Sequence, residues 1–334
     1  MFASPIVDGN LVFIGSCAGA FYALNKENGA VVWKYDITKD GDQTSFHGNP
    51  LLVEDLIITG TDGRSLGHVY AFEKATGKVR WKIPFTKGVA NSSGVPTDLV
   101  RSGSNAYGVA LGDELVCFEW ETGKLKWTFA SGFSKERFEW SHSPAVASQR
   151  VFFGGLDGVA YALEESTGKV VWHRALGAKI TTAITTVDDG LVLGTSDNKL
   201  YRLSQKSGEI LSEFTLSSKP WWACTAAENA ILLLTNNGGR VDTLHCFDLN
   251  LKKVIWQQKV ASEWSTARPF VWNGAALAGN VSGEVFAFRL SDGAQLWSHK
   301  LEGAIRSFGY AGAQLFFGTT QGKVFALSPQ TRNK

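Results

Sequence analysis

One short phrase recurs along nearly the whole chain, and this repetition constrains the fold more than any other feature. It is a turn with a glycine, followed by a segment with a central tryptophan, as in "EESTGKVVWHRAL" at 164–176. Further copies lie at 25–37, 73–85, 119–130 and 289–301, and more divergent copies lie at 204–216 and 248–260. A period of roughly 40–48 residues predicts a repeat architecture in which each unit is one small supersecondary structure.

The fourth repeat shows what one unit should look like. Residues 143–147, 151–155, 159–163 and 169–175 are short apolar segments separated by turn sequences. Such segments predict a four-stranded antiparallel meander. The glycine of the last turn is expected to adopt a positive φ. A sheet of this size cannot bury both of its faces alone, so we expect neighbouring sheets to stack radially as a β-propeller.

A tryptophan follows the turn glycine by four residues in most repeats. A ligand would need only one or two such rings, so the regular spacing favours packing between neighbouring sheets. We therefore predict a structural docking role for these residues, with Ser212 at the same place in the fifth repeat. They are Trp33, Trp81, Trp127, Trp172, Trp256 and Trp297.

The full set of repeats predicts a single all-β domain over residues 1–334, an eight-bladed β-propeller of four-stranded antiparallel blades. The blades are expected near 1–37, 46–85, 96–130, 141–176, 181–216, 222–260, 266–301 and 305–329. The last of them lacks a predicted outer strand. We expect an upstream segment or a second chain to complete it, because an unpaired edge invites strand addition.

The strings "FYALNKENGAVVW" (21–33), "VYAFEKATGKVRW" (69–81) and "AYALEESTGKVVW" (160–172) resemble the tryptophan-docking repeat of the quinoprotein-like β-propellers. These are the propellers typified by enzymes that use pyrroloquinoline quinone (PQQ). The resemblance covers essentially the whole chain. It implies one of two functional groups: the PQQ-dependent alcohol and sugar dehydrogenases, or the non-enzymatic outer-membrane barrel-assembly lipoproteins, which use the propeller to bind proteins.

The chain is closer in character to the second group. The vicinal cysteine pair that the alcohol dehydrogenases place over the quinone has no counterpart here. We therefore expect a non-enzymatic scaffold without a cofactor, which binds another protein or a small ligand on its long-loop face. One alternative is an oxidoreductase that uses PQQ with calcium, or a degenerate relative of one. The other is a sensor or binding module of a larger protein.

The expected binding face carries unusually long loops at 38–48, 86–97 and 131–142, and an enlarged turn at 61–68. Long loops on a rigid scaffold are where binding residues concentrate. Alignment of the repeats places polar and aromatic residues at the channel mouth on this face. They are His47, Asn49, Asp98, Trp140, His142, Trp222, Arg268 and Arg306, with Trp221 and Trp264 beside them.

These side chains could bind an anionic or planar ligand. They could equally form a solvated rim in which the arginines bond to backbone carbonyl groups. The histidines and Asp98 have no metal-ligand spacing, and no catalytic motif is present, so neither a metal site nor a catalytic residue is predicted.

Composition narrows the partners further. The net charge of +2, from 33 basic and 31 acidic residues, gives no reason to expect a nucleic-acid partner. No apolar run approaches the ~20 residues of a membrane span. The four cysteines have no ligand spacing and are expected to be buried free thiols. We expect a periplasmic or other extracytoplasmic location if a signal segment has been removed, and a cytoplasmic one if Met1 is the native start.

Overall fold

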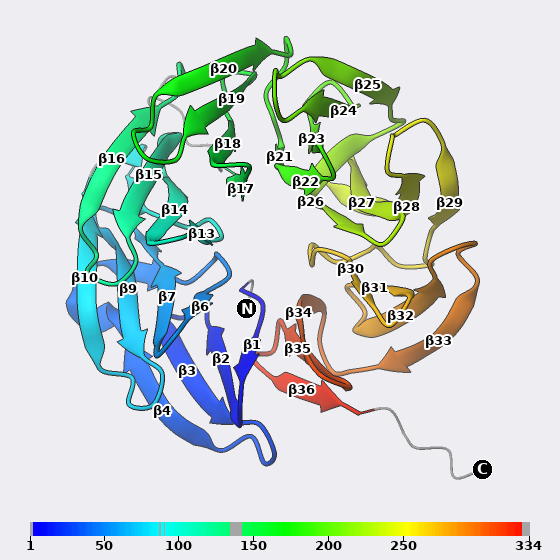
Figure 1. The fold of residues 1–334 in the computed structure, drawn as a ribbon. Coiled ribbons are helices and arrows are strands. Elements are labelled where there is room, and N and C mark those ends of the chain that lie inside the picture. The colour runs from blue at the N-terminus through cyan, green and yellow to red at the C-terminus, as the bar shows by residue number, and fades with distance from the viewer. Residues whose placement is uncertain (1–2, 87, 90, 134–141, 329–334) are drawn as a thin grey trace.

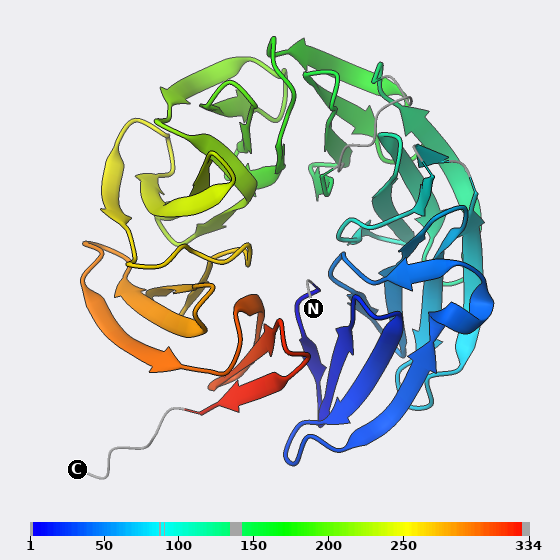
Figure 2. The ribbon, with the colours of Figure 1, turned by 180° about the vertical axis from the view of Figure 1, so that it is seen from behind.

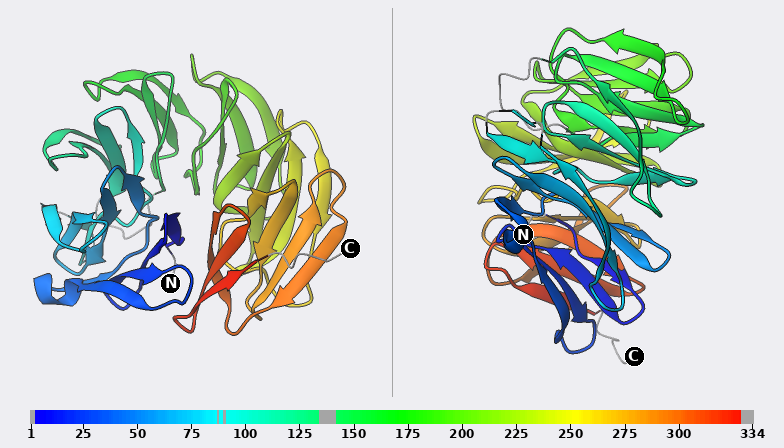
Figure 3. Two further views of the ribbon diagram at one scale, coloured as in Figure 1. Left: turned by 60° about the horizontal axis from the view of Figure 1, so that its bottom comes forward. Right: turned by 90° about the vertical axis from the view of Figure 1, so that its left-hand side faces the viewer.

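The structure, a computed structural model, describes residues 3–86, 88–89, 91–133 and 142–328. Its antiparallel sheets follow one another around a common axis, so that the molecule is a ring (Figures 1 and 2). The tilted views show twisted sheets that pack face to face against their neighbours (Figure 3). Within the described residues the one helical element is a short 3-10 turn, η1 (Ile37–Asp40). The all-β class predicted from the repeats is therefore confirmed.

Each sheet of the ring begins at the axis and runs outward in chain order. The first three contain β1 (Ile6–Asp8), β2 (Leu11–Gly15), β3 (Ala20–Asn25) and β4 (Val31–Asp36); β6 (Leu51–Val53), β7 (Leu56–Gly60), β9 (Gly67–Glu73) and β10 (Val79–Phe85); and β13 (Val100–Ser102), β14 (Asn105–Ala110), β15 (Glu114–Glu119) and β16 (Leu125–Ala130).

The next three sheets differ slightly in their strand number. They contain β17 (Ala145–Ala147), β18 (Arg150–Gly154), β19 (Val159–Glu164) and β20 (Val170–Ala175); β22 (Thr185–Val187), β23 (Gly190–Gly194), β24 (Lys199–Ser204) and β25 (Ile210–Thr215); and β26 (Lys219–Ala227), β27 (Ala230–Asn237), β28 (Arg240–Asp248) and β29 (Val254–Gln258). A fifth strand, β21 (Thr182–Ala183), joins β26 in parallel.

The last two sheets close the ring. They contain β30 (Phe270–Trp272), β31 (Ala275–Gly279), β32 (Glu284–Arg289) and β33 (Gln295–Lys300), and then β34 (Ile305–Ala311), β35 (Gln314–Thr319) and β36 (Val324–Leu327). In the part of the chain that the structure describes, this final sheet has three strands. Its inner strand β34 lies beside β1, and a Cβ on Gly309 would stand 2.2 Å from the Pro5 carbonyl oxygen.

Burial along the strands explains the sequence pattern. All five residues of β7 are buried, because the second strand of a sheet is covered on both faces by neighbouring sheets. The outer strand β10 instead alternates half-buried and exposed residues, as a strand with one covered face should. The buried apolar residues form clusters, each of which spans two consecutive sheets. The core is thus a series of inter-sheet layers.

The repeated tryptophan joins one sheet to the next. In the β19–β20 pair, Ala162 faces Trp172 but Leu163 faces Val170, so strand β20 has one extra residue and bulges beside the indole ring of Trp172. The indole then donates to a backbone oxygen in the outer turn of the following sheet. The bonds are Trp33 to Lys74 (2.8 Å), Trp81 to Glu121 (2.9 Å), Trp127 to Glu165 (3.1 Å), Trp172 to Gln205 (3.0 Å) and Trp256 to Leu290 (2.8 Å). Ser212 makes the corresponding bond, to the Asn250 oxygen at 2.6 Å.

Two of the predicted long loops, 38–48 and 86–97, and the enlarged turn at 61–68 contain short strands. Parts of them pair as an additional sheet, in the order β11 (Gly88–Val89), β12 (Ser92–Gly94), β8 (Asp62–Gly63) and β5 (Gln43–Ser45). Glycine permits this close packing, since a Cβ on Gly94 would stand 2.1 Å from the Thr61 carbonyl oxygen. Buried polar side chains also hold it: Gln43 donates to the Tyr70 hydroxyl and accepts from Thr61.

The structure corrects the expectation that all four cysteines are buried. Cys117, Cys224 and Cys246 are buried free thiols as predicted, but Cys17 is exposed. It lies in the turn between β2 and β3, where its side chain leaves the inter-sheet layers. None of the described residues forms a helix long and apolar enough to cross a membrane.

Candidate functional site

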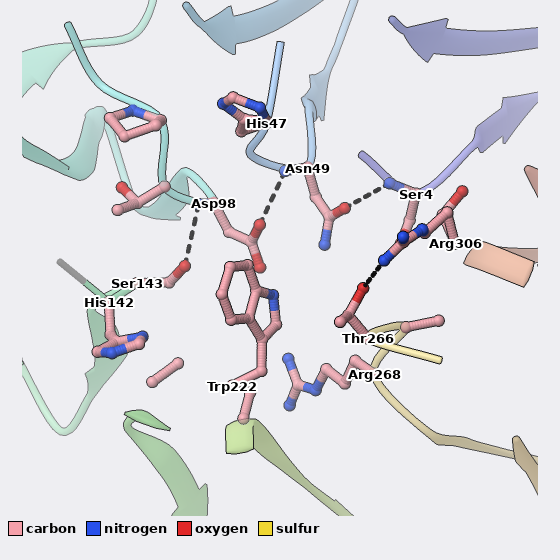
Figure 4. A pocket seen from close by; sticks show the side chains of 16 residues that line it. Ser4, His47, Asn49, Asp98, His142, Ser143, Trp222, Thr266, Arg268 and Arg306 are labelled. Atoms are coloured by element: carbon pink, nitrogen blue, oxygen red, sulfur yellow. Dashed lines mark hydrogen bonds between the residues drawn. The ribbon is translucent and has the colours of Figure 1, made fainter. Parts of the chain in front are cut away.

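A cavity of about 200 Å³ opens on the ring axis where the inner strands begin (Figure 4). We call it the mouth cavity. Seven of the eight residues predicted from the sequence to bind a ligand or partner line it, and Trp140 lies outside the described residues. The seven are His47, Asn49, Asp98, His142, Trp222, Arg268 and Arg306. They come from sequence positions up to 259 residues apart (306 − 47), and the repeat brings them together.

Two of the ten aromatic and polar candidates lie elsewhere. Trp264 is 1% exposed and packs in the core between β28 and β32, where its indole donates to the Gln258 carbonyl oxygen. Trp221 packs against the same core. The prediction of a place at the mouth is therefore wrong for Trp264, which pairs with Asn280 in an isolated bridge and packs inward. Trp221 does not line the cavity, but its ring stacks on that of Trp222 with the centroids 5.8 Å apart.

One half of the mouth cavity is bounded by a relay of hydrogen bonds between consecutive sheets. The backbone N–H of Ser4 donates to Asn49 Oδ1 (2.6 Å), and the N–H of Asn49 donates to Asp98 Oδ1 (2.8 Å). The N–H of Asp98 in turn donates to Ser143 Oγ (3.0 Å). Each side chain thus satisfies the backbone group that begins the preceding inner strand, which would otherwise face the cavity without a partner. Asn49 and Asp98 consequently have a structural role as well as a place at the site.

Arg268 and Arg306 form the other half of the wall of the mouth cavity. Arg268 donates through Nε to Thr225 Oγ1 (3.0 Å) and through its terminal nitrogen to the Cys224 carbonyl oxygen. Arg306 donates to Thr266 Oγ1 at 2.6 Å. These contacts match the rim alternative for Arg268, since its guanidinium bonds to a backbone carbonyl. A guanidinium has five N–H groups, so two such bonds leave donors for a ligand.

Asp98 is the acidic member of the site. Burial raises the pKa of its carboxyl group, while the Asn49 N–H and the positive charge of Arg268 oppose that rise. His47 is the third cation of the lining, after Arg268 and Arg306. Burial lowers its pKa, but Asp62 and Cys17 outweigh this effect and raise the pKa to about 9. The His47 charge is paired with Asp62. The two arginines outnumber the one carboxyl group of the lining, Asp98, so the mouth cavity favours an anionic group.

His142 and Trp222 form the aromatic wall. Their ring centroids lie 6.4 Å apart with the planes at 82°, in an edge-to-face arrangement. Burial lowers the pKa of His142 to about 4, so its ring is neutral near pH 7. Trp222 is 39% exposed and has φ of +65°, at an irregularity in the β26–β27 pairing. A bulky residue in this backbone region costs on the order of 1–3 kcal/mol, and such strain concentrates at binding sites.

Sequence reasoning missed several serines and threonines of the cavity. Ser4, Ser143 and Ser307 stand at the start of inner strands, the same repeat position as Asn49 and Asp98, so the repeat alignment itself held the signal. Ser307 is 2% exposed, and its Oγ has no hydrogen-bond partner among the described residues. A buried hydroxyl beside a cavity is an available partner for a bound polar group.

The ring and its axial cavity define a PQQ-type β-propeller. BamB from Moraxella catarrhalis has the same fold, with a TM-score of 0.79 at 18% identity over 98% of this chain and 96% of that one. The quinohemoprotein alcohol dehydrogenase of Comamonas testosteroni gives a TM-score of 0.75 at 13% identity over 94% of this chain and 69% of that one.

The profile of the family described as outer membrane protein assembly factor BamB matches residues 65–136 and 112–333. The chain belongs to this family. BamB of Moranella endobia is 24% identical over 170 residues (47% of this chain, 44% of that protein), and BamB of Yersinia pestis is 22% identical over 228 residues (62% and 57%). The matches thus span about half the length of these relatives.

A shorter segment of the chain is similar to a PQQ-dependent enzyme. The quinoprotein alcohol dehydrogenase PedH of Pseudomonas putida is 38% identical over 61 residues, which are 18% of this chain and 10% of that enzyme. The donors of the mouth cavity do not fit a quinone held with calcium. Calcium takes six to eight oxygen ligands, whereas the cavity lining includes one carboxylate, Asp98, and one of its oxygens already accepts from Asn49. Within the described residues, no three His, Cys, Asp or Glu side chains gather as a metal site.

Proposed function

We propose that this chain is a non-enzymatic, protein-binding scaffold in outer-membrane protein assembly, and that its partner docks on the long-loop face over the mouth cavity. The observation that carries the proposal is Trp222, a large aromatic side chain held exposed at the cavity by a strained backbone. An exposed tryptophan at the centre of a concave, polar-rimmed surface is typical of a binding hot spot. Membership of the assembly-factor family supports the same conclusion.

Charge suggests what kind of group the partner presents. Arg268 and Arg306 lie on one side of the cavity and the His47 imidazolium on the other. A carboxylate from an acidic loop or a chain end would meet the two arginines, and the free Ser307 hydroxyl could donate to it. The volume is below the roughly 300–1,000 Å³ of small-molecule sites, which favours an inserted side chain over a tricyclic cofactor.

The same proposal includes the finer architecture. We take the ring as one domain with eight blades, one for each sheet that begins at the axis, and with the additional β5–β8–β11–β12 sheet as a decoration of the binding face. The eighth blade would be completed by a strand from another segment or chain. A family whose described members assemble outer-membrane proteins supports an extracytoplasmic location.

The experiment is complementation in source cells that lack the chain. Outer-membrane protein levels should fall in these cells, recover with the wild type, and recover poorly with Trp222→Ala. Leu296→Ala is the matched control, because Leu296 is a comparably exposed residue (47%) on the outer strand β33. Full recovery with Trp222→Ala at normal protein abundance would contradict docking at the mouth cavity. An absorption spectrum recorded after addition of PQQ and calcium tests the oxidoreductase alternative, which requires that the chain bind the quinone.

A further inference from the structure

The exposed cysteine differs from the other three in its surroundings. Burial raises the pKa of the Cys117, Cys224 and Cys246 thiols to about 12, so these thiols remain protonated and shielded. Cys17 is exposed, at the tip of the turn between β2 and β3. A native molecule therefore presents one accessible thiol.

That thiol belongs to a cluster of three chemically complementary groups. The Cys17 side chain is a hydrogen-bonding partner of the His47 imidazole. The same ring places Nδ1 3.0 Å from Asp62 Oδ1. The His47 and Asp62 side chains are only 21% and 13% exposed, so the thiol is at the solvent end of the cluster and the carboxylate at the protein end.

The backbone holds the three residues in place. The N–H of Phe46, next to His47, donates to the Ser16 carbonyl oxygen, next to Cys17, at 3.3 Å. Ser45 pairs with Asp62 between β5 and β8, and its hydroxyl donates to the Cys17 carbonyl oxygen at 3.5 Å. The cluster is therefore organised by the additional sheet, which the repeat itself does not require.

The charges around His47 determine its protonation state. Burial lowers the pKa of His47, but the hydrogen bonds and charges of Asp62 and Cys17 raise it to about 9. The ring is thus an imidazolium at neutral pH. Asp98, His142 and Arg268 line the other walls of the cavity that His47 faces. An imidazolium beside a cysteine stabilises the thiolate, which is the reactive form of the side chain.

We propose that Cys17 is a reactive thiolate and the site of a reversible covalent modification by small aliphatic disulfides. The thiolate sulfur attacks one sulfur of the disulfide R–S–S–R, a new Cys17–S–S–R bond forms, and the original S–S bond breaks. The electron pair leaves with the second sulfur as RS⁻, which takes a proton from the His47 imidazolium. Because His47 lines the mouth cavity, the attached group would stand at its edge. The proposal does not depend on the identity of any docked protein.

The test is the reaction of the native protein with 4,4′-dithiodipyridine between pH 6 and 9, where the reagent is mainly neutral. We expect one equivalent per chain to react fast, about tenfold faster at pH 6 than a free cysteine, with a rate that varies little up to pH 8. Cys17→Ser should abolish this fast phase. A wild-type rate that rises tenfold for each pH unit, as it does for an unassisted thiol, would overturn the proposal without any variant.

Variants of His47 and Asp62 show whether Cys17 reacts fast because these side chains assist it or only because it is exposed. His47→Gln should reduce the rate at pH 6 at least fivefold, and Asp62→Asn, which keeps the shape of the side chain, should reduce it by a smaller factor. Circular dichroism confirms that each variant is folded. The control is His173→Gln, since His173 is an exposed histidine on the outer strand β20. Equal rates for the wild type and a folded His47→Gln protein would overturn the role of the imidazole.

Discussion

The indole Nε1 of Trp172 donates a hydrogen bond of 3.0 Å to the backbone oxygen of Gln205, 33 residues further along the chain. This bond fastens the outer strand of one sheet to the outer turn of the next. The same ring lies so close to Gly208 that a Cβ there would stand 2.5 Å from it. A tryptophan and the glycine of the following repeat therefore act as one docking pair, which explains why both recur along the sequence.

Loss of a docking ring should reduce stability. We expect Trp172→Ala to lower the free energy of unfolding by about 3 kcal/mol, because it leaves a cavity between two sheets and an unpaired Gln205 oxygen. Trp222→Ala, at the exposed mouth position, should change it by less than about 1 kcal/mol. Urea unfolding of both variants checks this contrast, and equal losses would refute the separation of docking from binding tryptophans.

The glycine side of the pair offers a matched comparison. Gly168 and Gly29 have nearly identical φ of +70° and +73°, but a Cβ on Gly168 would stand 2.6 Å from the Trp127 ring, whereas one on Gly29 would meet nothing within 4 Å. Gly29→Ala should therefore cost about 1 kcal/mol for the left-handed backbone alone. Gly168→Ala should cost a further 1–3 kcal/mol, roughly, for displacement of the ring. Thermal unfolding measures both, and an equal effect would show that the ring contact contributes nothing.

The open space at Gly29 also bears on how the ring is completed. In the described part of the chain, β36 pairs only with β35, and no tryptophan ring packs against Gly29. A peptide with the sequence of residues 168–176, which carries its own tryptophan, should add to β36 and raise the melting temperature. The same peptide with alanine in place of tryptophan should bind at least tenfold more weakly. If isothermal calorimetry finds equal affinities, or no binding, the proposed completion of the eighth blade is wrong.

His245 should make the fold sensitive to acid. It is 2% exposed, and both ring nitrogens have partners, Gln257 at Nδ1 and Thr235 at Nε2, each at 3.0 Å. The amide of Gln257 donates to Nδ1, so the folded protein holds the ring neutral. Burial lowers its pKa to about 4 from 6.5, and the folded state therefore binds fewer protons than the unfolded state between these values. Stability contributed by this group is present above pH 6.5 and lost as the pH falls toward 4, by about 3 kcal/mol in total.

The measurement is urea unfolding from pH 7 to pH 4. His245→Gln should remove this part of the pH dependence, and His173→Gln, at an exposed position, should not. An unchanged slope in a folded His245→Gln protein would show that the buried ring is not responsible.

The repeat explains how far the sequence could predict the structure. Because each unit places equivalent residues at equivalent points of the ring, alignment of the units located His47, Asp98, Arg268 and the other residues of the mouth cavity before any coordinates. It also placed four strands of the fourth repeat within a residue or two of β17 to β20.

What the sequence did not predict depends on contacts between different units. The β5–β8–β11–β12 sheet pairs short segments from three separate loops, and none of them has a strand pattern of its own. Trp264 resembled the other aromatic residues near the mouth, yet it is buried in the core, as is Ile180, which makes the corresponding isolated bridge. The exposure of Cys17 follows from its turn, whereas the other three cysteines lie on strands. The pairing of the loop segments is non-local and has no periodic signal.

Photo-crosslinking tests most directly whether a partner protein docks over the mouth cavity. A photoreactive phenylalanine analogue would be placed at position 222 or, as the control, at position 296 on the outer strand, and expressed in source cells. We expect one dominant protein adduct from position 222, which Arg306→Ala reduces at least fivefold, and little adduct from position 296. A dominant adduct from position 296 and none from position 222 would contradict docking over the mouth cavity, and would place the binding surface on the outer rim of the ring.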